Sequence, residues 1–211
     1  MCNLYRMTKS VGEVARWFEA EDLAAGANFA SEVYPGYPGL VVAEGTARVM
    51  TWGFPLALKG AKGQMLKPRP VNNARTDKLA GPFWRDSFAK RRCVIPLTAW
   101  AEAEGERGAM TCTWLTRPDV ALFAAAGVWR MSAEWGAVYS MVMTDSCGAA
   151  AECHDRMPVL LSDSDWDRWT SGAPEDAMQL CVPFGGEVTL DRTTDRWGKP
   201  SASPEPQPSL L

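Results

Sequence analysis

The stretch from residue 92 to residue 144 constrains the fold most tightly, because it is a series of short apolar runs separated by turn residues. Gly105 and Gly108 lie in one gap between runs, and Pro118 lies in another. Runs of about four to eight residues bounded in this way are typical of strands. Residues 110–114, Met-Thr-Cys-Thr-Trp, alternate apolar and polar side chains, which predicts that one face of this strand is buried. The five predicted strands cover residues 92–95, 98–103, 110–115, 121–128 and 138–144.

Signals on either side of this stretch predict the remaining elements. Ser10 and Glu13 have the spacing of a capping box, and Val14 and Phe18 follow at helical spacing, which predicts a helix over residues 11–21. The other predicted elements are strands at 40–43, 47–52 and 157–161, a long loop at 55–73, a short helix after Gly81-Pro82 and a helix after Ser162. Together they predict an α+β fold of mainly antiparallel sheets, arranged as a pseudo-barrel with peripheral helices.

The composition is that of an ordinary globular domain. We place one domain at residues 1–198 and expect the Pro- and Ser-rich residues 199–211 to be a disordered tail. No apolar stretch approaches the roughly 18 residues that a membrane span needs. The N-terminus shows no export pattern, and the six cysteines show no framework spacing. We therefore expect a cytoplasmic monomer with reduced thiols and no membrane partner.

Basic residues are unevenly distributed along the chain. The net charge is −3, yet residues 59–92 hold ten Lys and Arg against two Asp, whereas residues 157–211 hold nine acids against four bases. This asymmetry is consistent with one positive face that binds phosphates on an otherwise acidic body. From charge alone, a solvated basic segment is an equally good interpretation.

Cys2 would become the first residue if Met1 were removed, and it would then carry a free α-amine beside its thiol. Reference pKa values of about 7.7–8.0 for the amine and about 8.5 for the thiol leave both nucleophiles partly available at neutral pH. The amine of a 1,2-aminothiol attacks an aldehyde to form an imine, and the thiol then closes a five-membered thiazolidine ring. Taken alone, a cysteine at position 2 is better explained by chance, as one of six cysteines in the chain.

Three further positions carry side chains suited to proton transfer or to ligand binding. His154 is the only histidine, and its reference pKa lies near neutrality. Glu102 lies between apolar neighbours in a predicted strand, where partial desolvation would raise its pKa. Asn73 ends the predicted long loop and could orient a sugar or carbonyl oxygen. Cys147, Cys153 and His154 offer three zinc ligands, but their spacing matches no standard site, so we expect no metal.

Five segments stand in order between residue 1 and about residue 161. They are Met1-Cys2, Trp52-Gly53 followed by Pro55, Asn73-Ala74-Arg75, Arg92–Pro96 with Trp100 and Glu102, and His154–Pro158. Together they resemble the SOS-response-associated peptidase (SRAP) family, whose members crosslink to abasic DNA, over about three quarters of the chain. No single segment is specific, but five in this order are hard to attribute to chance. The resemblance implies an antiparallel pseudo-barrel with a DNA groove that leads to Cys2.

The resemblance also implies roles for individual residues. Cys2 would be the nucleophile, Asn73 would hold the sugar or the adduct, Glu102 would act as acid and base near the α-amine, and His154 would assist proton transfer. The DNA-binding residues would be Arg75, Arg156, Trp52, Lys67 and Arg69, although Trp52 could equally be a core residue. No cofactor is implied.

The chain departs from the family pattern in four places. Asn3-Leu4 replaces the Gly-Arg that often follows the cysteine, and Ala101 and Ala103 stand where aromatics usually flank the glutamate. Gly26–Pro38 lacks the usual Asn-x-Ala-Pro turn, and the segment after Val182 lacks the usual Asn-rich ending. Backbone contacts at the site and the desolvation of the glutamate are the features that these differences affect.

These observations predict a protein that binds single-stranded DNA through its phosphates and forms a thiazolidine crosslink from Cys2 to an abasic aldehyde, which shields the lesion. One alternative is a cysteine peptidase that uses Cys2 with His154 and Asn73. A narrower version of it is a hydrolase that removes its own Met1 with the help of Glu102. The other is a non-covalent single-strand binding module. Cys2→Ala would leave the DNA binding of that module unchanged.

Overall fold

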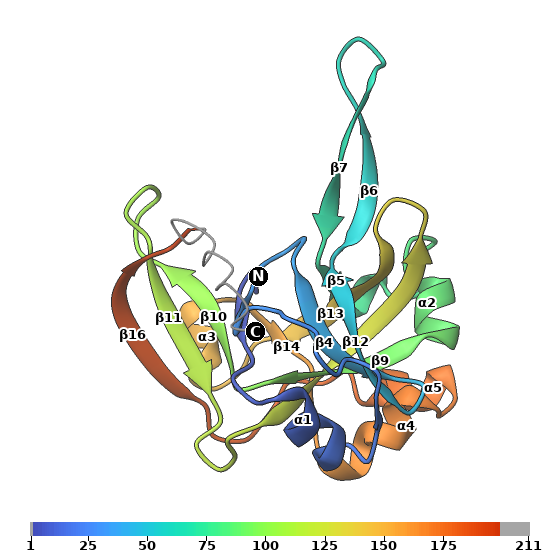
Figure 1. Cartoon of the computed structure of the whole chain (residues 1–211). Helices are drawn as coiled ribbons and strands as arrows, with labels where there is room; N and C mark the ends of the chain where they lie inside the picture. Colours follow the sequence, from blue (N-terminus) through green and yellow to red (C-terminus); the bar gives the residue numbers. More distant parts are fainter. Residues whose placement is uncertain (1, 199–211) are drawn as a thin grey trace, which may run out of the picture.

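Strands from both ends of the chain and from its middle form two sheets and a separate two-stranded ribbon in the computed structural model, which describes residues 2–198 (Figure 1). Most pairings are antiparallel, and the short helices lie outside the sheets. The predicted α+β pseudo-barrel with peripheral helices is therefore confirmed. The expected tail at residues 199–211 lies outside the described residues.

Five strands of the larger sheet close into a barrel. Their order is β13, β12, β9, β4 and β5, and the barrel closes where β5 runs parallel to β13 with Trp52 opposite Tyr139. The other neighbouring pairs are antiparallel. The five strands are β4 (Pro38–Ala43), β5 (Thr46–Trp52), β9 (Arg92–Leu97), β12 (Phe123–Ser132) and β13 (Gly136–Asp145). Four short strands extend the sheet: β2 (Glu21–Asp22) on β5, β8 (Asn73–Arg75) and β14 (Arg156–Pro158) on β13, and β15 (Leu160–Leu161) on β12.

The second sheet places the start of the chain against β10. Its order is β16-β11-β10-β1-β3, with bounds β1 (Tyr5–Arg6), β3 (Glu32–Val33), β10 (Ala99–Glu104), β11 (Thr111–Thr116) and β16 (Thr189–Arg196). Tyr5 lies opposite Trp100, and the N–H of Ala101 donates to the carbonyl of Leu4 at 2.9 Å. The residues before β1 therefore continue alongside β10, and this places Cys2 beside the middle of that strand.

The alternating strand at residues 110–114 is buried on both faces, not only on one as predicted. Cys112 and Trp114 join Leu4 and Ala101 in a small apolar cluster on one side of the second sheet. Thr113 on the other face is also fully buried. Alternating apolar and polar side chains show that the two faces of a strand differ in chemistry. In this strand the polar face, which carries Thr113, is buried as well.

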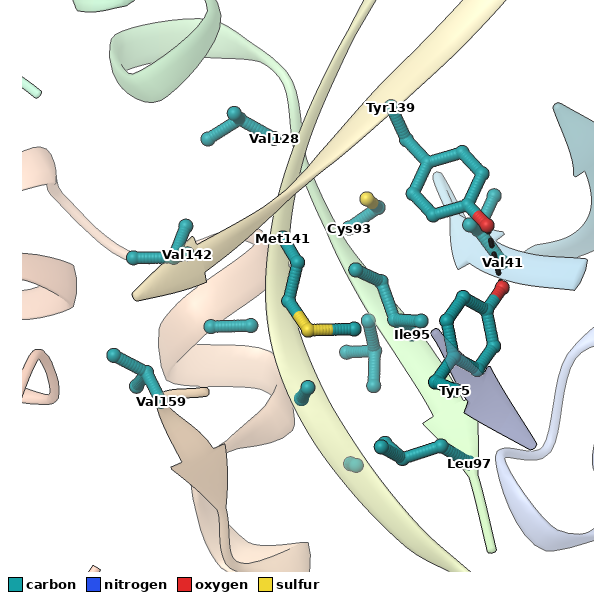
Figure 2. Packing of buried hydrophobic residues seen from close by; sticks show 14 of the residues in the cluster. Tyr5, Val41, Cys93, Ile95, Leu97, Val128, Tyr139, Met141, Val142 and Val159 are labelled. Atoms are coloured by element: carbon teal, nitrogen blue, oxygen red, sulfur yellow. Dashed lines mark hydrogen bonds between the residues drawn. The ribbon is translucent and has the colours of Figure 1, made fainter. Parts of the chain in front are cut away.

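Two tyrosines from different sheets meet in the main hydrophobic core. The hydroxyls of Tyr5 and Tyr139 form a short hydrogen bond, drawn as a dashed line among apolar side chains in Figure 2. Both side chains are fully buried, and burial raises the pKa of each well above its ordinary value. A Cβ at Gly39 would lie 2.2 Å and 2.3 Å from these hydroxyl oxygens, so only glycine fits there. The pair joins the two sheets, because Tyr5 belongs to β1 and Tyr139 to β13.

The helices are short and peripheral: α1 (Val11–Trp17), α2 (Arg85–Lys90), α3 (Ala150–Cys153), α4 (Trp166–Thr170) and α5 (Pro174–Gln179). The capping box of Ser10 and Glu13 is confirmed. The predicted helix over 11–21 nevertheless ends at Trp17, because Glu19 adopts a positive φ of 50° and residues 21–22 pair with β5. Within residues 2–198, no helix is both long enough and apolar enough to cross a membrane.

The predicted long loop at residues 55–73 is instead a hairpin, and that prediction was wrong. Its strands β6 (Phe54–Lys59) and β7 (Met65–Val71) form a ribbon that projects from the body of the molecule (Figure 1). Most of its side chains are partly or fully exposed, so the apolar alternation that marks a half-buried strand is absent. Pro55 and Pro70, which argued against strands, face each other in the ribbon.

Candidate functional site

Cys2 lies at the junction of the two sheets and is fully buried. Its thiol donates to the carbonyl of Leu4 at 3.3 Å. Burial raises the pKa of the thiol well above its ordinary value, and the nearby carboxyl group of Glu102 raises it further. The sulfur is therefore held as a protonated thiol, with Glu102 as its acidic neighbour.

Two consecutive asparagines hold the backbone of Cys2. The Nδ2 of Asn73 donates to the carbonyl oxygen of Cys2 at 2.8 Å, and the Nδ2 of Asn72 donates to the same oxygen at 3.0 Å. Asn73 begins β8, which is fixed against β13 with Asn73 opposite Met141. Its Oδ1 is buried and accepts no hydrogen bond from the described residues. Asn73 was predicted as a site residue from the sequence, whereas Asn72 was not.

Trp52 supports this asparagine pair from inside the core. Its indole N–H donates to the carbonyl of Asn72 at 3.0 Å. Its ring contacts Tyr5 edge-on with centroids 5.0 Å apart and stacks on Tyr139 at 6.5 Å. The side chain is fully buried, so it offers no face on which a nucleobase could stack. The structure thus places Trp52 behind the site, and the expectation that it lies on the DNA path is corrected here.

Glu102 is a buried carboxyl group in β10, only 2% exposed. Burial raises its pKa to about 7, and the carboxylate of Asp155 adds to the rise. The alanines on either side do not leave it in water, because the two sheets themselves cover it. A carboxyl group with this pKa can both give and accept a proton near neutral pH.

His154 follows α3 and is partly buried, which lowers its pKa. Its Nδ1 accepts from the backbone N–H of Arg156 at 3.0 Å and also lies 2.7 Å from Oδ1 of Asp155. One nitrogen cannot accept the first bond and donate the second. We assign the backbone bond, because the Asp155 side chain is 79% exposed and free to rotate. Neutral His154 then carries its proton on Nε2.

An ion-pair network fixes α3 against β10. Arg192 donates from Nε to Glu104 at 3.1 Å and from an Nη to Glu152 at 2.9 Å. Glu104 lies two residues after Glu102 in β10, and Glu152 lies two residues before His154. The bridge therefore holds the segment that carries His154 next to the strand that carries Glu102. Among residues 2–198, no three His, Cys, Asp or Glu side chains gather as a metal site would require.

Arg75 and Arg156 flank the end of β13 from its two edges. Met143 lies opposite Arg75 of β8, and Asp145 lies opposite Arg156 of β14. Arg75 makes two hydrogen bonds to Asp77, and Arg156 pairs with Asp145 at 2.9 Å. Each guanidinium group is therefore held in place by an exposed carboxylate.

Lys67 and Arg69 lie on the ribbon, where both are exposed. Lys67 lines a cavity of about 480 Å³ together with Tyr37 and Trp135. We name this the ribbon cavity. A second cavity of about 320 Å³, which we name the Asn3 cavity, is lined by Asn3, the neighbour of Cys2, and shares Pro35 and Pro70 with the ribbon cavity. The two cavities are therefore adjacent, and we refer to them together as the groove.

Part of the basic stretch at residues 59–92 serves the fold instead of the surface. Arg92 is buried and donates to the backbone carbonyls of Phe88, Trp169 and Gly172. Arg91 pairs with Asp86. Charge counting alone could not separate these structural arginines from the exposed cations of the ribbon.

The comparisons with known proteins agree on one family and one fold. The family model described as "SOS response associated peptidase (SRAP)" matches residues 1–198. A solved structure from Bordetella bronchiseptica is 21% identical, covers 91% of this chain and 99% of its own, and has a TM-score of 0.75. A structure from Bacteroides thetaiotaomicron is 18% identical, covers 90% and 91%, and has a TM-score of 0.74. A phage-related protein from B. bronchiseptica is 16% identical, covers 91% and 94%, and has a TM-score of 0.64. No curated protein matches significantly.

Proposed function

The chain belongs to the SOS response associated peptidase (SRAP) family, and from this premise we propose that it crosslinks Cys2 to the aldehyde of an abasic site in single-stranded DNA. The product is a thiazolidine, formed after Met1 is removed, and it shields the lesion. The observation that carries the proposal is the position of Cys2. Its carbonyl is held by Asn73 at 2.8 Å, and its thiol lies close enough to Glu102 for that carboxyl group to raise its pKa.

The reaction needs no oxidant, reductant or cofactor. The neutral α-amine of Cys2 adds to the aldehyde carbon and forms a carbinolamine. Protonation of the carbinolamine hydroxyl breaks its C–O bond, releases one water and leaves an iminium ion. The sulfur then bonds to the iminium carbon, and the thiol proton leaves. The net change joins an aldehyde and an aminothiol, with the loss of one water.

Glu102 supplies and recovers the proton in this sequence. Its protonated form gives a proton to the departing hydroxyl, and the resulting carboxylate accepts the proton of the thiol. Because burial raises its pKa to about 7, both forms are populated at neutral pH. The thiol itself has a raised pKa, so a nearby base is needed at the ring-closing step.

Asn73 and His154 act on the substrate side. The buried Oδ1 of Asn73 has no partner among the described residues and is available to accept from the amine or from a sugar hydroxyl. His154, with its proton on Nε2, donates a hydrogen bond to the ring oxygen of the abasic sugar as the C1′–O4′ bond breaks. The proton that the C1′ hydroxyl loses passes to that ring oxygen through water, so His154 stays neutral. The open aldehyde is the form that the amine attacks.

The DNA strand follows the groove from the ribbon cavity to Asn3. Lys67 and Arg69 contact phosphates along the ribbon, and Arg75 and Arg156 contact those near the end of β13. Tyr37 is 41% exposed in the ribbon cavity and offers a ring for base stacking. These cationic contacts are to phosphates and not to base edges. The affinity for DNA therefore depends little on base sequence and falls strongly as the salt concentration rises.

The buried thiol favours this reaction over peptide hydrolysis. A cysteine peptidase needs a thiolate or an adjacent base that generates one. The Cys2 thiol instead donates to the Leu4 carbonyl, and burial keeps it protonated. In the crosslinking reaction the amine attacks first, so the initial step does not require a thiolate.

The test incubates the purified protein with an oligonucleotide that carries one abasic site, followed by denaturing electrophoresis. We expect a band that forms without reductant and survives denaturation. Cys2→Ala abolishes it, whereas Cys147→Ala, which removes a partly exposed thiol elsewhere, leaves it unchanged. A band that persists in Cys2→Ala, or DNA binding that never becomes covalent, would overturn the proposal.

A further inference from the structure

The Asn3 cavity lies directly beside the reacting residue and has no role in the chemistry described above. Its volume of about 320 Å³ falls at the lower end of the range for small-molecule sites, about 300–1,000 Å³. Asn3, Tyr34 and Trp197 line it. Because Asn3 is the neighbour of Cys2, a strand that presents its abasic sugar to Cys2 brings an adjacent nucleotide to this cavity.

Two aromatic side chains form fixed walls of the cavity. Tyr34 and Trp197 both pack against the small apolar cluster that contains Leu4 and Trp114. The backbone N–H of Trp197 donates to the carbonyl of Met110 at 2.8 Å, and this bond anchors the residue to the sheet. The two rings are only partly buried, so they keep surface on which a planar base can stack.

The side-chain amide of Asn3 adds a hydrogen-bonding group to these aromatic walls. Its Oδ1 accepts from the Nδ2 of Asn72 at 3.0 Å, and this bond orients the amide. Its own Nδ2, with two N–H donors, is then free to reach a ligand on an exposed side chain. The N7 atom of adenine and of guanine is an acceptor, and it is common to both purines.

The walls come from three segments in which this chain departs from the family pattern. Asn3 stands where the family often has glycine, Tyr34 lies in Gly26–Pro38 without the usual turn, and Trp197 follows Val182 in the segment that lacks the usual Asn-rich ending. The cavity is therefore built from segments that differ from the usual family pattern, and not from the residues proposed for the crosslinking chemistry.

We propose that the Asn3 cavity binds the purine base that neighbours the abasic site, stacking it on Tyr34 and Trp197 and bonding its N7 to the Asn3 amide. This inference rests on the proposed crosslinking function and adds a preference for sequence context. A chain that crosslinks every abasic strand equally would still have the proposed crosslinking function, but it would lack the preference for a neighbouring purine.

The first test measures crosslinking rates on oligonucleotides whose neighbour, on the 5′ or the 3′ side of the abasic site, is A, G, C or T. We expect purines on one side to react about fivefold faster than pyrimidines under subsaturating protein, because only purines present N7 to the Asn3 amide and one hydrogen bond is worth about this much. Trp197→Ala and Asn3→Ala reduce that ratio toward one. Trp17→Ala, which removes a partly buried ring from α1, keeps it. Equal rates for all neighbours overturn the inference, whereas no crosslink at all overturns the proposed function.

The second test reports stacking without any covalent step. Cys2→Ala protein is titrated into an oligonucleotide that carries a tetrahydrofuran abasic analogue beside the fluorescent base 2-aminopurine. We expect the fluorescence to fall on binding, because stacking on an aromatic ring quenches it. Combining Trp197→Ala with Tyr34→Ala removes the quenching. Quenching that is unchanged in this triple variant contradicts the assignment.

Discussion

The side-chain amide of Asn73 and the backbone carbonyl of Cys2 are joined by a 2.8 Å hydrogen bond, although the two residues are 71 positions apart in the sequence. The bond is possible because β8 is fixed to the end of β13, while the start of the chain is fixed to β10. It therefore connects the barrel to the second sheet at the point where the reacting residue lies.

We predict that Asn73→Ala lowers the crosslinking rate about tenfold, the effect of losing one well-placed hydrogen bond. Asn72→Ala should reduce the rate less. Cys2 then keeps the Asn73 bond, and the buried Oδ1 of Asn73 remains available to the substrate. Single-turnover rates at saturating protein measure both. Equal losses in the two variants would show that the asparagines only hold the backbone.

Glu102→Gln should make the protein more stable at neutral pH than the wild type. The pKa of Glu102 rises from 4.5 to about 7 on folding, so the folded state binds this proton more tightly than the unfolded state. The wild type therefore loses stability as pH rises from about 4.5 to about 7, by about 3 kcal/mol in full. Urea unfolding of both proteins at about pH 5 and about pH 8 measures the gap, which should widen at the higher pH. A pH-independent gap would contradict the buried acid.

The same substitution should change the pH profile of crosslinking. If Glu102 transfers the protons, the wild-type rate has an inflection near its pKa of about 7. Glu102→Gln lowers the rate and removes this inflection, leaving the titration of the α-amine. Rates measured across this pH range with the same abasic oligonucleotide decide the point. A slower variant that keeps the inflection would assign it to another group.

Local patterns predicted the parts of the fold that bury one apolar face. The strands at 40–43 and 47–52 were predicted as two apolar runs, and the structure joins them as the hairpin of β4 and β5 through a turn in which Glu44 and Gly45 both take positive φ. The ribbon was not predicted, because strands with little burial on either face carry no apolar alternation. The early end of α1 depends on pairing of residues 21–22 with β5, which is a tertiary effect.

The site was predictable where the residue type itself carries chemistry. The structure brings Cys2, Asn73 and Glu102 together, as the resemblance implied. Trp52 could not be placed from sequence, because a tryptophan suits a core and a stacking surface equally. Asn72 and the bridging Arg192 act only through folded neighbours, so no local pattern marked them.

Removing one hydroxyl of the buried tyrosine pair should destabilise the fold. Tyr139→Phe leaves the buried hydroxyl of Tyr5 without its partner, at a cost of about 1–3 kcal/mol. Tyr5→Phe has the same effect for the same reason. The double variant should lose less than the sum of the two, because no hydroxyl is left unsatisfied. Urea unfolding of all four proteins gives the coupling, and strict additivity would contradict a direct hydroxyl pair.

Lys67→Ala should lower the salt dependence of DNA binding. If Lys67 contacts one phosphate, the slope of log K against log salt should fall by about 0.7 for single strands. The measurement uses Cys2→Ala protein and a labelled strand, so that only reversible binding is recorded. Lys9→Ala, at the start of α1, is the control and should leave the slope unchanged. If the Cys2→Ala protein and its Lys67→Ala and Lys9→Ala derivatives all gave the same slope, Lys67 would not contact a phosphate and the proposed DNA path along the ribbon would be contradicted.

The mass of the crosslinked species tests the central claim most directly. The account predicts an adduct equal to the abasic oligonucleotide plus the chain without Met1, less one water, formed without borohydride. An adduct that retains Met1, or one that appears only after reduction, would contradict a thiazolidine at Cys2.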